Sequence, residues 1–125
     1  MANKADFDKG IEIRKKLNKE RYGKMTTALA ELAPDLEEMV TEVVFGRVWA
    51  RPQLEIKMRS VATIAALTVL GRLPQLKGHI LNGLNVGLSK QEIIEILMQM
   101  AFYGGLPAAV SAFQTAKEAF AEAGV

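Results

Sequence analysis

The side chains best suited to chemistry in this sequence stand in its second half, around a single histidine, His79. Further along, Glu95, Gln99 and Tyr103 recur every four residues, a spacing that places them on one face of a helix. An imidazole changes its charge near neutral pH, and a carboxylate beside it would raise its pKa and orient the ring. This set of side chains suits the transfer of a proton to or from a small molecule.

Two arginines could hold the acidic group of such a molecule. Arg51 stands before the rigid Pro52, and Arg59 lies in the first turns of an expected helix. A guanidinium group can bind a carboxylate through two parallel hydrogen bonds. The residues therefore predict a pocket for a small carboxylate. The plainer alternatives are that His79 is a hydrogen-bonded structural residue and that Arg51 is a surface charge.

Other reaction classes are excluded by what the sequence lacks. Without cysteine there is no thiolate nucleophile, disulfide or thiolate metal site. One histidine with scattered carboxylates lacks the convergent spacing of a zinc or iron site. No Gly-x-Ser-x-Gly motif surrounds Ser60, and no glycine-rich phosphate loop occurs.

Hydrophobic periodicity predicts helices along the whole chain. We expect Asp6 or Asp8 to cap the first helix and Gly46 to end the helix over 35–45. An irregular connection is expected over residues 47–55, and a tight chain reversal at Gly104-Gly105. Ser89 and Glu92 form a capping box. The first helix is expected to run to about Arg21, and the others are expected at 24–32, 35–45, 56–70, 73–86, 89–103 and 108–122.

The helix over 56–70 is apolar almost all round and should be central. If the helices over 73–86 and 89–103 form an antiparallel hairpin around Gly87, His79 and Glu95 lie equally far from the turn and could form a hydrogen bond.

Length and composition favour one all-α domain, a bundle of six to seven helices. Half of the 125 residues are hydrophobic but only 6% are aromatic, a mixture that suits close helix packing. Twelve of the 16 basic residues and ten of the 14 acidic ones precede Ser60. Helices with so few charges after Ser60 should be buried on most sides, in the core or against other subunits.

The same composition bears on partners and location. A net charge of +2 is too small for a nucleic-acid footprint, and glycines and Pro107 interrupt the uncharged stretch of residues 96–116 that could otherwise span a membrane. The first ten residues, MANKADFDKG, lack the apolar segment of a secretory signal. We therefore expect a cytoplasmic protein that binds neither nucleic acid nor membranes.

The order of motifs in the chain resembles the carboxymuconolactone decarboxylase family. The matching residues are Arg51-Pro52, Leu54, Arg59-Ser60, Thr63-Ile64-Ala65, Leu67, His79, Asn85, Gly87, Glu92-Ile93, Glu95, Gln99, Tyr103, Gly105 and Pro107-Ala108-Ala109. The resemblance implies an alkylhydroperoxidase-like helical fold, with N-terminal helices in 1–45, a family core in 46–113 and a C-terminal helix in 106–123. It also implies a homo-oligomeric ring, a hexamer or trimer.

The activity that the resemblance implies is a decarboxylation without any cofactor. In the family, γ-carboxymuconolactone loses carbon dioxide in a step of aromatic catabolism. By this resemblance His79, Glu95 and Tyr103 are the expected catalytic residues, and Arg51, Arg59, Ser60 and Gln99 are expected to bind the substrate. Rival interpretations are a non-catalytic ligand-binding or scaffold relative and a lyase or isomerase for another cyclic acid.

The chain departs from both branches of the family at particular positions. The alkylhydroperoxidase branch uses a Cys-x-x-Cys pair before the histidine and a glutamate further upstream, where this chain has Arg72, Gln75 and Ser60. We therefore expect no thiol peroxidase activity. Val86 and Val110 replace expected asparagines, and Gly104 stands where a cysteine can occur. These departures leave the true substrate open.

Overall fold

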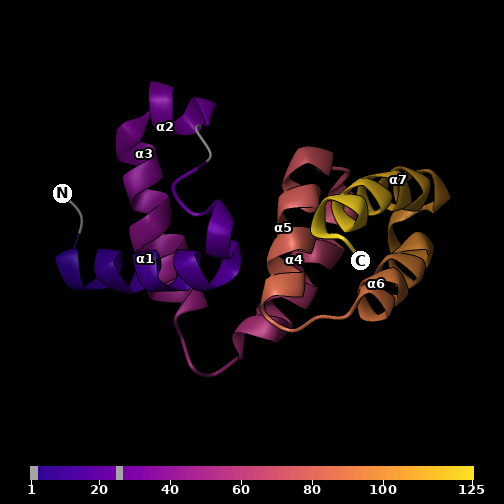
Figure 1. Ribbon diagram of the computed structural model, residues 1–125, viewed down its shortest axis with the longest axis horizontal. Helices are drawn as coiled ribbons and strands as arrows, with labels where there is room; N and C mark the ends of the chain where they lie inside the picture. Colours follow the sequence, from indigo (N-terminus) through magenta and orange to yellow (C-terminus); the bar gives the residue numbers. More distant parts are fainter. Residues whose placement is uncertain (1–2, 25–26) are drawn as a thin grey trace. The chain divides into compact units, whose positions relative to one another are not determined.

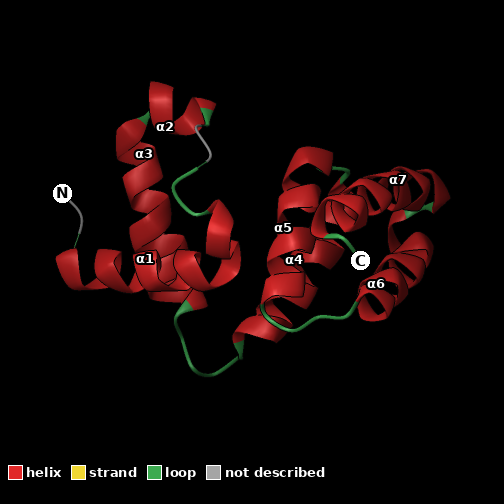
Figure 2. Ribbon diagram, viewed as in Figure 1, coloured by secondary structure: helices red, strands yellow, loops and turns green. Residues whose placement is uncertain are grey.

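The computed structural model describes residues 3–24 and 27–125, and the prediction of an all-α protein is confirmed. The described residues form seven α-helices, a short 3₁₀-helix and a π-helix, joined by turns (Figure 2). Their contacts divide the chain into two compact units, the first reaching to Ile56 and the second beginning at Lys57. The prediction of a single domain is not tested by this division and stays a prediction.

The first unit is built from two long helical segments that cross (Figure 1). Its elements are α1 (Lys4–Asn18), the 3₁₀-helix η1 (Lys19–Arg21), α2 (Ala28–Leu32), α3 (Pro34–Met39) and the π-helix η2 (Val40–Trp49). Helix α3 continues into η2 without a break, and η2 makes the most extensive contact with α1.

Two glycines allow the backbones of α1 and η2 to touch. A Cβ atom on Gly10 would lie 1.9 Å from the carbonyl oxygen of Thr41, and one on Gly46 would lie 1.9 Å from that of Asp6. Real Cβ atoms do not approach backbone atoms so closely, so any other residue at either position would push the helices apart. Leu17 and Trp49 complete the small buried core of this unit.

Three expectations for this region need correction or qualification. The cap of α1 is Asn3, whose side chain accepts a hydrogen bond from the Asp6 N–H, and not Asp6 or Asp8. The helix expected to end at Gly46 continues to Trp49, because Gly46 is buried against α1 and does not terminate the helix. The start of the helix expected at 24–32 falls partly on residues outside those described, and α2 itself begins at Ala28.

The second unit contains four helices, α4 (Ile56–Leu70), α5 (Leu73–Asn85), α6 (Lys90–Gly104) and α7 (Leu106–Ala123). Their boundaries lie close to those predicted. The turns are also as expected: Gly87 and Gly105 have φ of 107° and 96°, where a side chain would be strained. The core is formed by Ile64, Leu76, Ile80, Leu81, Leu88, Ile93, Leu97, Ala112, Ala116, Ala119 and Phe120.

Helix α7 is the packing partner of both α5 and α6. The alanines at 109, 112, 116 and 119 are buried at a helical spacing of three and four residues, so both neighbours can come close. The antiparallel hairpin expected for α5 and α6 is not their main contact, since α6 packs chiefly on α7. The buried alanines of α7 let the backbone of α6 approach closely.

Helix α4 is less enclosed within the chain than its apolar composition suggested. Ser60, Ile64 and Thr68 form its buried face, while Met58 and Leu70 are exposed. The sparsely charged helices were expected to be buried either in the core or against other subunits. Within the single chain, the core buries α4 only in part.

Among the described helices, none combines the length and the apolar character needed to cross a lipid bilayer.

We predict that Gly10→Ala destabilises the first unit by about 2 kcal/mol or more, because the new methyl group meets backbone that cannot rotate away. Urea unfolding followed by the fluorescence of Trp49 measures this change. Gly78→Ala, in a helix where a Cβ meets no atom within 4 Å, is the control and should gain about 0.5–1 kcal/mol. Equal stability of Gly10→Ala and the wild type would contradict the close crossing.

Candidate functional site

His79 lies on α5, beside the core stripe of Leu76 and Ile80. The side chain is half-buried, and its Nδ1 atom is enclosed within the protein. Leu76 and Ile80 are fully buried on either side of it in the sequence, so the imidazole stands at the edge of an apolar core. A partly enclosed imidazole at an apolar boundary is suited to proton transfer, because it is held in place and can still be reached.

Ser60 is fully buried on the neighbouring helix α4. Its hydroxyl oxygen has no hydrogen-bond partner among the described residues. In the single chain Ser60 is closed to solvent, and its role in substrate binding stays a prediction.

The structure separates Ser60 from His79 along the helices that carry them. Ile64 lies against Gly83 and Lys57 against Gly87, so α4 and α5 run antiparallel with the start of α4 beside the end of α5. Ser60 is therefore level with the last turn of α5, about six residues or roughly 9 Å along the axis from His79. A serine and histidine so placed do not form a nucleophile and base pair.

Glu95, Gln99 and Tyr103 share one face of α6, as their spacing predicted, and all three are exposed. Tyr103 is 77% exposed. The Glu95 carboxylate accepts a hydrogen bond from Gln91 Nε2 at 3.3 Å. The hydrogen bond between His79 and Glu95 stays a prediction.

The capping box that begins α6 is confirmed. Ser89 Oγ accepts from the Glu92 N–H at 3.0 Å, and the Ser89 N–H donates to Glu92 Oε1 at 2.9 Å. Lys57 Nζ lies 3.8 Å from the same carboxylate. The backbone hydrogen bond from Ser89, aided by the charge of Lys57, lowers the pKa of Glu92. These contacts fix the start of α6, the helix that carries Glu95, Gln99 and Tyr103.

The two arginines fall in different units. Arg59 is half-buried on α4, next to Ser60. Arg51 follows η2 in the first unit and lines a shallow hollow of about 280 Å³ together with Lys9, Arg47 and Asp6. Arg47 lies 3.8 Å from Asp6, so three basic groups and one acid surround the hollow. Such a surplus of positive charge attracts anions, and the role of Arg51 in binding a carboxylate stays a prediction.

The departures from the family pattern also have definite places. Val86 is half-buried just after α5, and Val110 is 60% exposed on α7. Gly104 lies where a Cβ atom would be 3.0 Å from the Cα of Val69, so the end of α6 approaches α4 closely. A cysteine at 104 would force these helices apart.

The first unit also contains a hollow that the sequence did not predict, lined by Arg14, Glu37 and Thr41 among others. The signal that could have revealed it is the helical spacing of residues 7, 11, 14 and 18, which puts a charged residue in the middle of the apolar face of α1. Among the described residues, no group of three His, Asp or Glu side chains could hold a metal ion.

Comparisons with known proteins add to this geometry. A sequence model of the carboxymuconolactone decarboxylase family matches residues 34–118. The chain is 31% identical to a 4-carboxymuconolactone decarboxylase of Acinetobacter baylyi over an alignment 126 residues long, which covers 100% of this chain and 94% of that protein. It is 32% identical to a nitrosuccinic acid decarboxylase of Metarhizium robertsii, over 85% of this chain and 75% of that protein. An uncharacterised 15.0 kDa protein of Paracoccus denitrificans is 38% identical over 76% of this chain and 72% of its own length.

We predict that Glu92→Gln lowers the melting temperature at neutral pH and that the difference from the wild type disappears at low pH. The folded-state pKa of Glu92 is depressed, so its contribution is present above the ordinary glutamate value of about 4.3 and is lost as the pH falls through the folded value. Thermal unfolding followed by circular dichroism at pH 7 and near pH 3 tests this. A difference that persists unchanged in acid would contradict it.

Proposed function

Because the chain belongs to the carboxymuconolactone decarboxylase family, we propose that it is a carboxy-lyase that removes carbon dioxide from a small cyclic or branched carboxylic acid without a cofactor. The observation that carries this proposal is the match along the whole chain to a protein named as a 4-carboxymuconolactone decarboxylase. A second relative is named for decarboxylation of nitrosuccinic acid, so the two names share this reaction and differ in substrate.

The two named acids have one electronic property in common. Breaking the carbon–carboxylate bond of 4-carboxymuconolactone leaves an electron pair that the unsaturated lactone can delocalise, and in nitrosuccinic acid the nitro group does the same. Carbon dioxide leaves, and a proton must then be added to carbon. The protein has to seat the acid, stabilise the delocalised charge and supply that proton.

The roles that we propose follow from the chemistry of each side chain and from its match to the family pattern. His79, half-buried at the edge of the core, supplies the proton. Glu95 orients it, and Tyr103 and Gln99 donate hydrogen bonds to the oxygen that gains negative charge. Arg51 or Arg59 holds the carboxylate through its guanidinium group. Ser60 is the remaining proposed substrate contact, although it is closed to solvent in the single chain.

We further propose that the site is completed when copies of the chain assemble into a hexamer or trimer. Large apolar side chains stand exposed at the end of α4, on α6 and at the start of α7: Leu70 65%, Met98 51%, Phe102 89%, Leu106 66% and Val110 60%. So much exposed apolar surface is characteristic of an interface. Gln99 and Tyr103 lie between these residues on α6, so a second copy covering this surface would also enclose the polar face.

Replacing His79 tests the catalytic role. His79→Asn and His79→Gln keep one polar contact, so we expect folded oligomers with near-normal melting temperatures whose turnover of 4-carboxymuconolactone falls about a hundredfold or more. Carbon dioxide release measures turnover, with nitrosuccinic acid as a second substrate. Gln75→Asn, exposed one turn earlier on α5, is the matched control and should keep its activity.

Wild-type turnover in a folded His79 variant would refute the catalytic assignment. Failure of the wild-type oligomer to release carbon dioxide from either acid would count against the lyase proposal itself.

Replacing Phe102 tests the assembly. Because this side chain is 89% exposed on the apolar surface, a charge there should prevent its burial in an interface. Light scattering at micromolar concentration should give a hexamer or trimer for the wild type and for Phe102→Leu, and a smaller species for Phe102→Lys. A monomeric mass for the wild type would contradict the proposal.

A further inference from the structure

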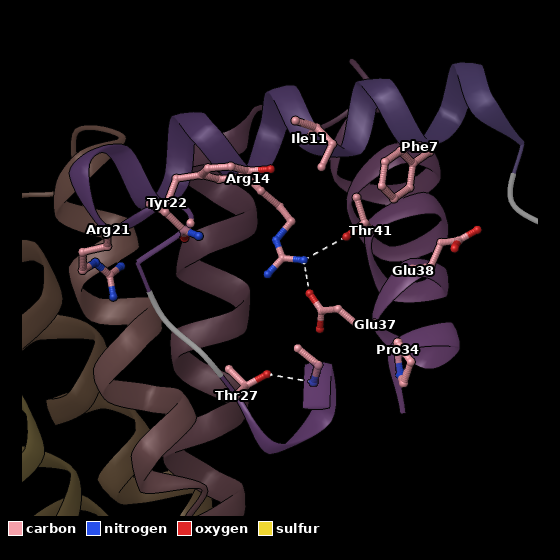
Figure 3. A pocket seen from close by; sticks show the side chains of 13 residues that line it. Phe7, Ile11, Arg14, Arg21, Tyr22, Thr27, Pro34, Glu37, Glu38 and Thr41 are labelled. Carbon is pink, nitrogen blue, oxygen red and sulfur yellow. Dashed lines mark hydrogen bonds and ion pairs between the residues drawn. The ribbon is translucent and has the colours of Figure 1, made fainter. Parts of the chain in front are cut away.

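The first unit contains a hollow of about 400 Å³ that the decarboxylation chemistry does not use. Its walls come from α1, the turn after η1, α2, α3 and the start of η2 (Figure 3). Phe7, Ile11, Ala30 and Pro34 provide apolar surface, and polar side chains project among them. A hollow of this size, with apolar walls and a few polar groups, has the form of a small-molecule site.

Arg14 is the central polar group of this hollow. Its Nη1 atom donates to Thr41 Oγ1 at 2.8 Å and forms a short hydrogen-bonded ion pair with Glu37. The guanidinium also lies over the ring of Phe45, 5.5 Å from its centroid. Three contacts fix the group in one orientation, and Figure 3 shows it turned into the hollow with Glu37 and Thr41 on one side.

The other donors of this guanidinium remain available to a ligand. An arginine has five N–H donors, and the hydrogen bonds of Arg14 to described residues both use Nη1. The Arg14 and Glu37 side chains are only 27% and 25% exposed, so a hydrogen bond made here is shielded from water. The hollow therefore offers a fixed and partly desolvated donor edge beside apolar walls.

The charges around the hollow indicate which ligands fit. Arg14 and Arg21 are balanced by Glu37 and Glu38, so the lining has no net charge. An anion would compete with Glu37 for Arg14 and would be repelled by Glu38. A cation would compete with the two arginines for the two glutamates. Bringing an unbalanced charge into such a site costs desolvation that no remaining partner repays. A neutral acceptor can use the remaining donors of Arg14 without breaking its ion pair.

We propose that this hollow is a second small-molecule site, specific for uncharged compounds that carry a carbonyl group on an apolar ring or chain. The carbonyl oxygen accepts from Arg14, and the apolar body packs on Phe7, Ile11 and Pro34. The site lies wholly within the first unit and includes none of the residues proposed for decarboxylation.

Three probes of nearly equal size test the ligand class. Benzamide is neutral and carries a carbonyl group, benzoate is its anionic counterpart, and benzylamine is a cationic one. Titration of the full chain by saturation-transfer NMR should show benzamide binding at least about fivefold more tightly than either charged probe. Benzoate or benzylamine binding as tightly as benzamide would overturn the proposal, and so would an absence of benzamide binding at millimolar concentration.

Variants locate the binding. Ala30→Leu adds bulk to the lining of the hollow and should weaken benzamide binding about tenfold. Ala28→Leu makes the same change on α2 at an exposed position outside the lining and should leave binding unchanged. Arg14→Lys keeps a cation beside Glu37 but removes the planar set of donors, and should also weaken benzamide.

Arg14→Lys decides the matter if Ala30→Leu fails to fold, since it acts on the donors and not on the space. If folded Ala30→Leu or folded Arg14→Lys binds benzamide as tightly as the wild type does, benzamide binds elsewhere and the proposed site is refuted. Decarboxylase turnover is not part of this test, so its result is independent of the proposed function.

Discussion

The backbone contact between α1 and η2 at Gly10 and Gly46 is the constraint on which the first unit depends. Because both glycines touch carbonyl groups of the opposite helix, the crossing has no room for adjustment. Thr41, whose carbonyl meets Gly10, thereby brings its hydroxyl to Arg14, and Phe45 one turn later brings its ring beneath the guanidinium. A side chain at either glycine would displace these partners together, so the packing of two helices and the orientation of one charged group are a single structural feature.

Small residues have a comparable role in the second unit. The alanine stripe of α7 lets α5 and α6 pack on it, and Gly104 lets the end of α6 approach Val69. This arrangement satisfies the inner face of each helix but leaves the outer faces of α4, α6 and α7 apolar and exposed. Since Gln99 and Tyr103 lie on that outer surface, the assembly that we propose and the chemistry that we propose concern the same residues. Exclusion of water from a decarboxylation site would then be a property of the oligomer.

Local signals accounted for much of the fold. The capping box of Ser89 and Glu92, the glycine turns at Gly87 and Gly105 and the spacing of Leu76 and Ile80 all depend on residues within one or two turns, and the structure has them where they were expected. Expectations failed where distant contacts decide. Gly46 reads locally as a helix end, yet it is buried against α1 and the helix continues to Trp49. A helix partner for α6 could not be chosen from the sequence, because α5 and α7 both offer apolar faces.

By itself, the sequence determined the helical class and the family, because these follow from hydrophobic periodicity, turn chemistry and a specific order of motifs. It also supplied the polar residues that we propose for the site. The placement of those residues belonged to the tertiary structure. Spacing along a helix predicts which side chains share a face, but whether that face is covered depends on how helices pack. Hence Ser60 is enclosed while Tyr103 is exposed. Arg14 is a charged residue on an apolar helix face, and only the tertiary structure brings it its partners, Glu37 and Thr41, from 23 and 27 residues away.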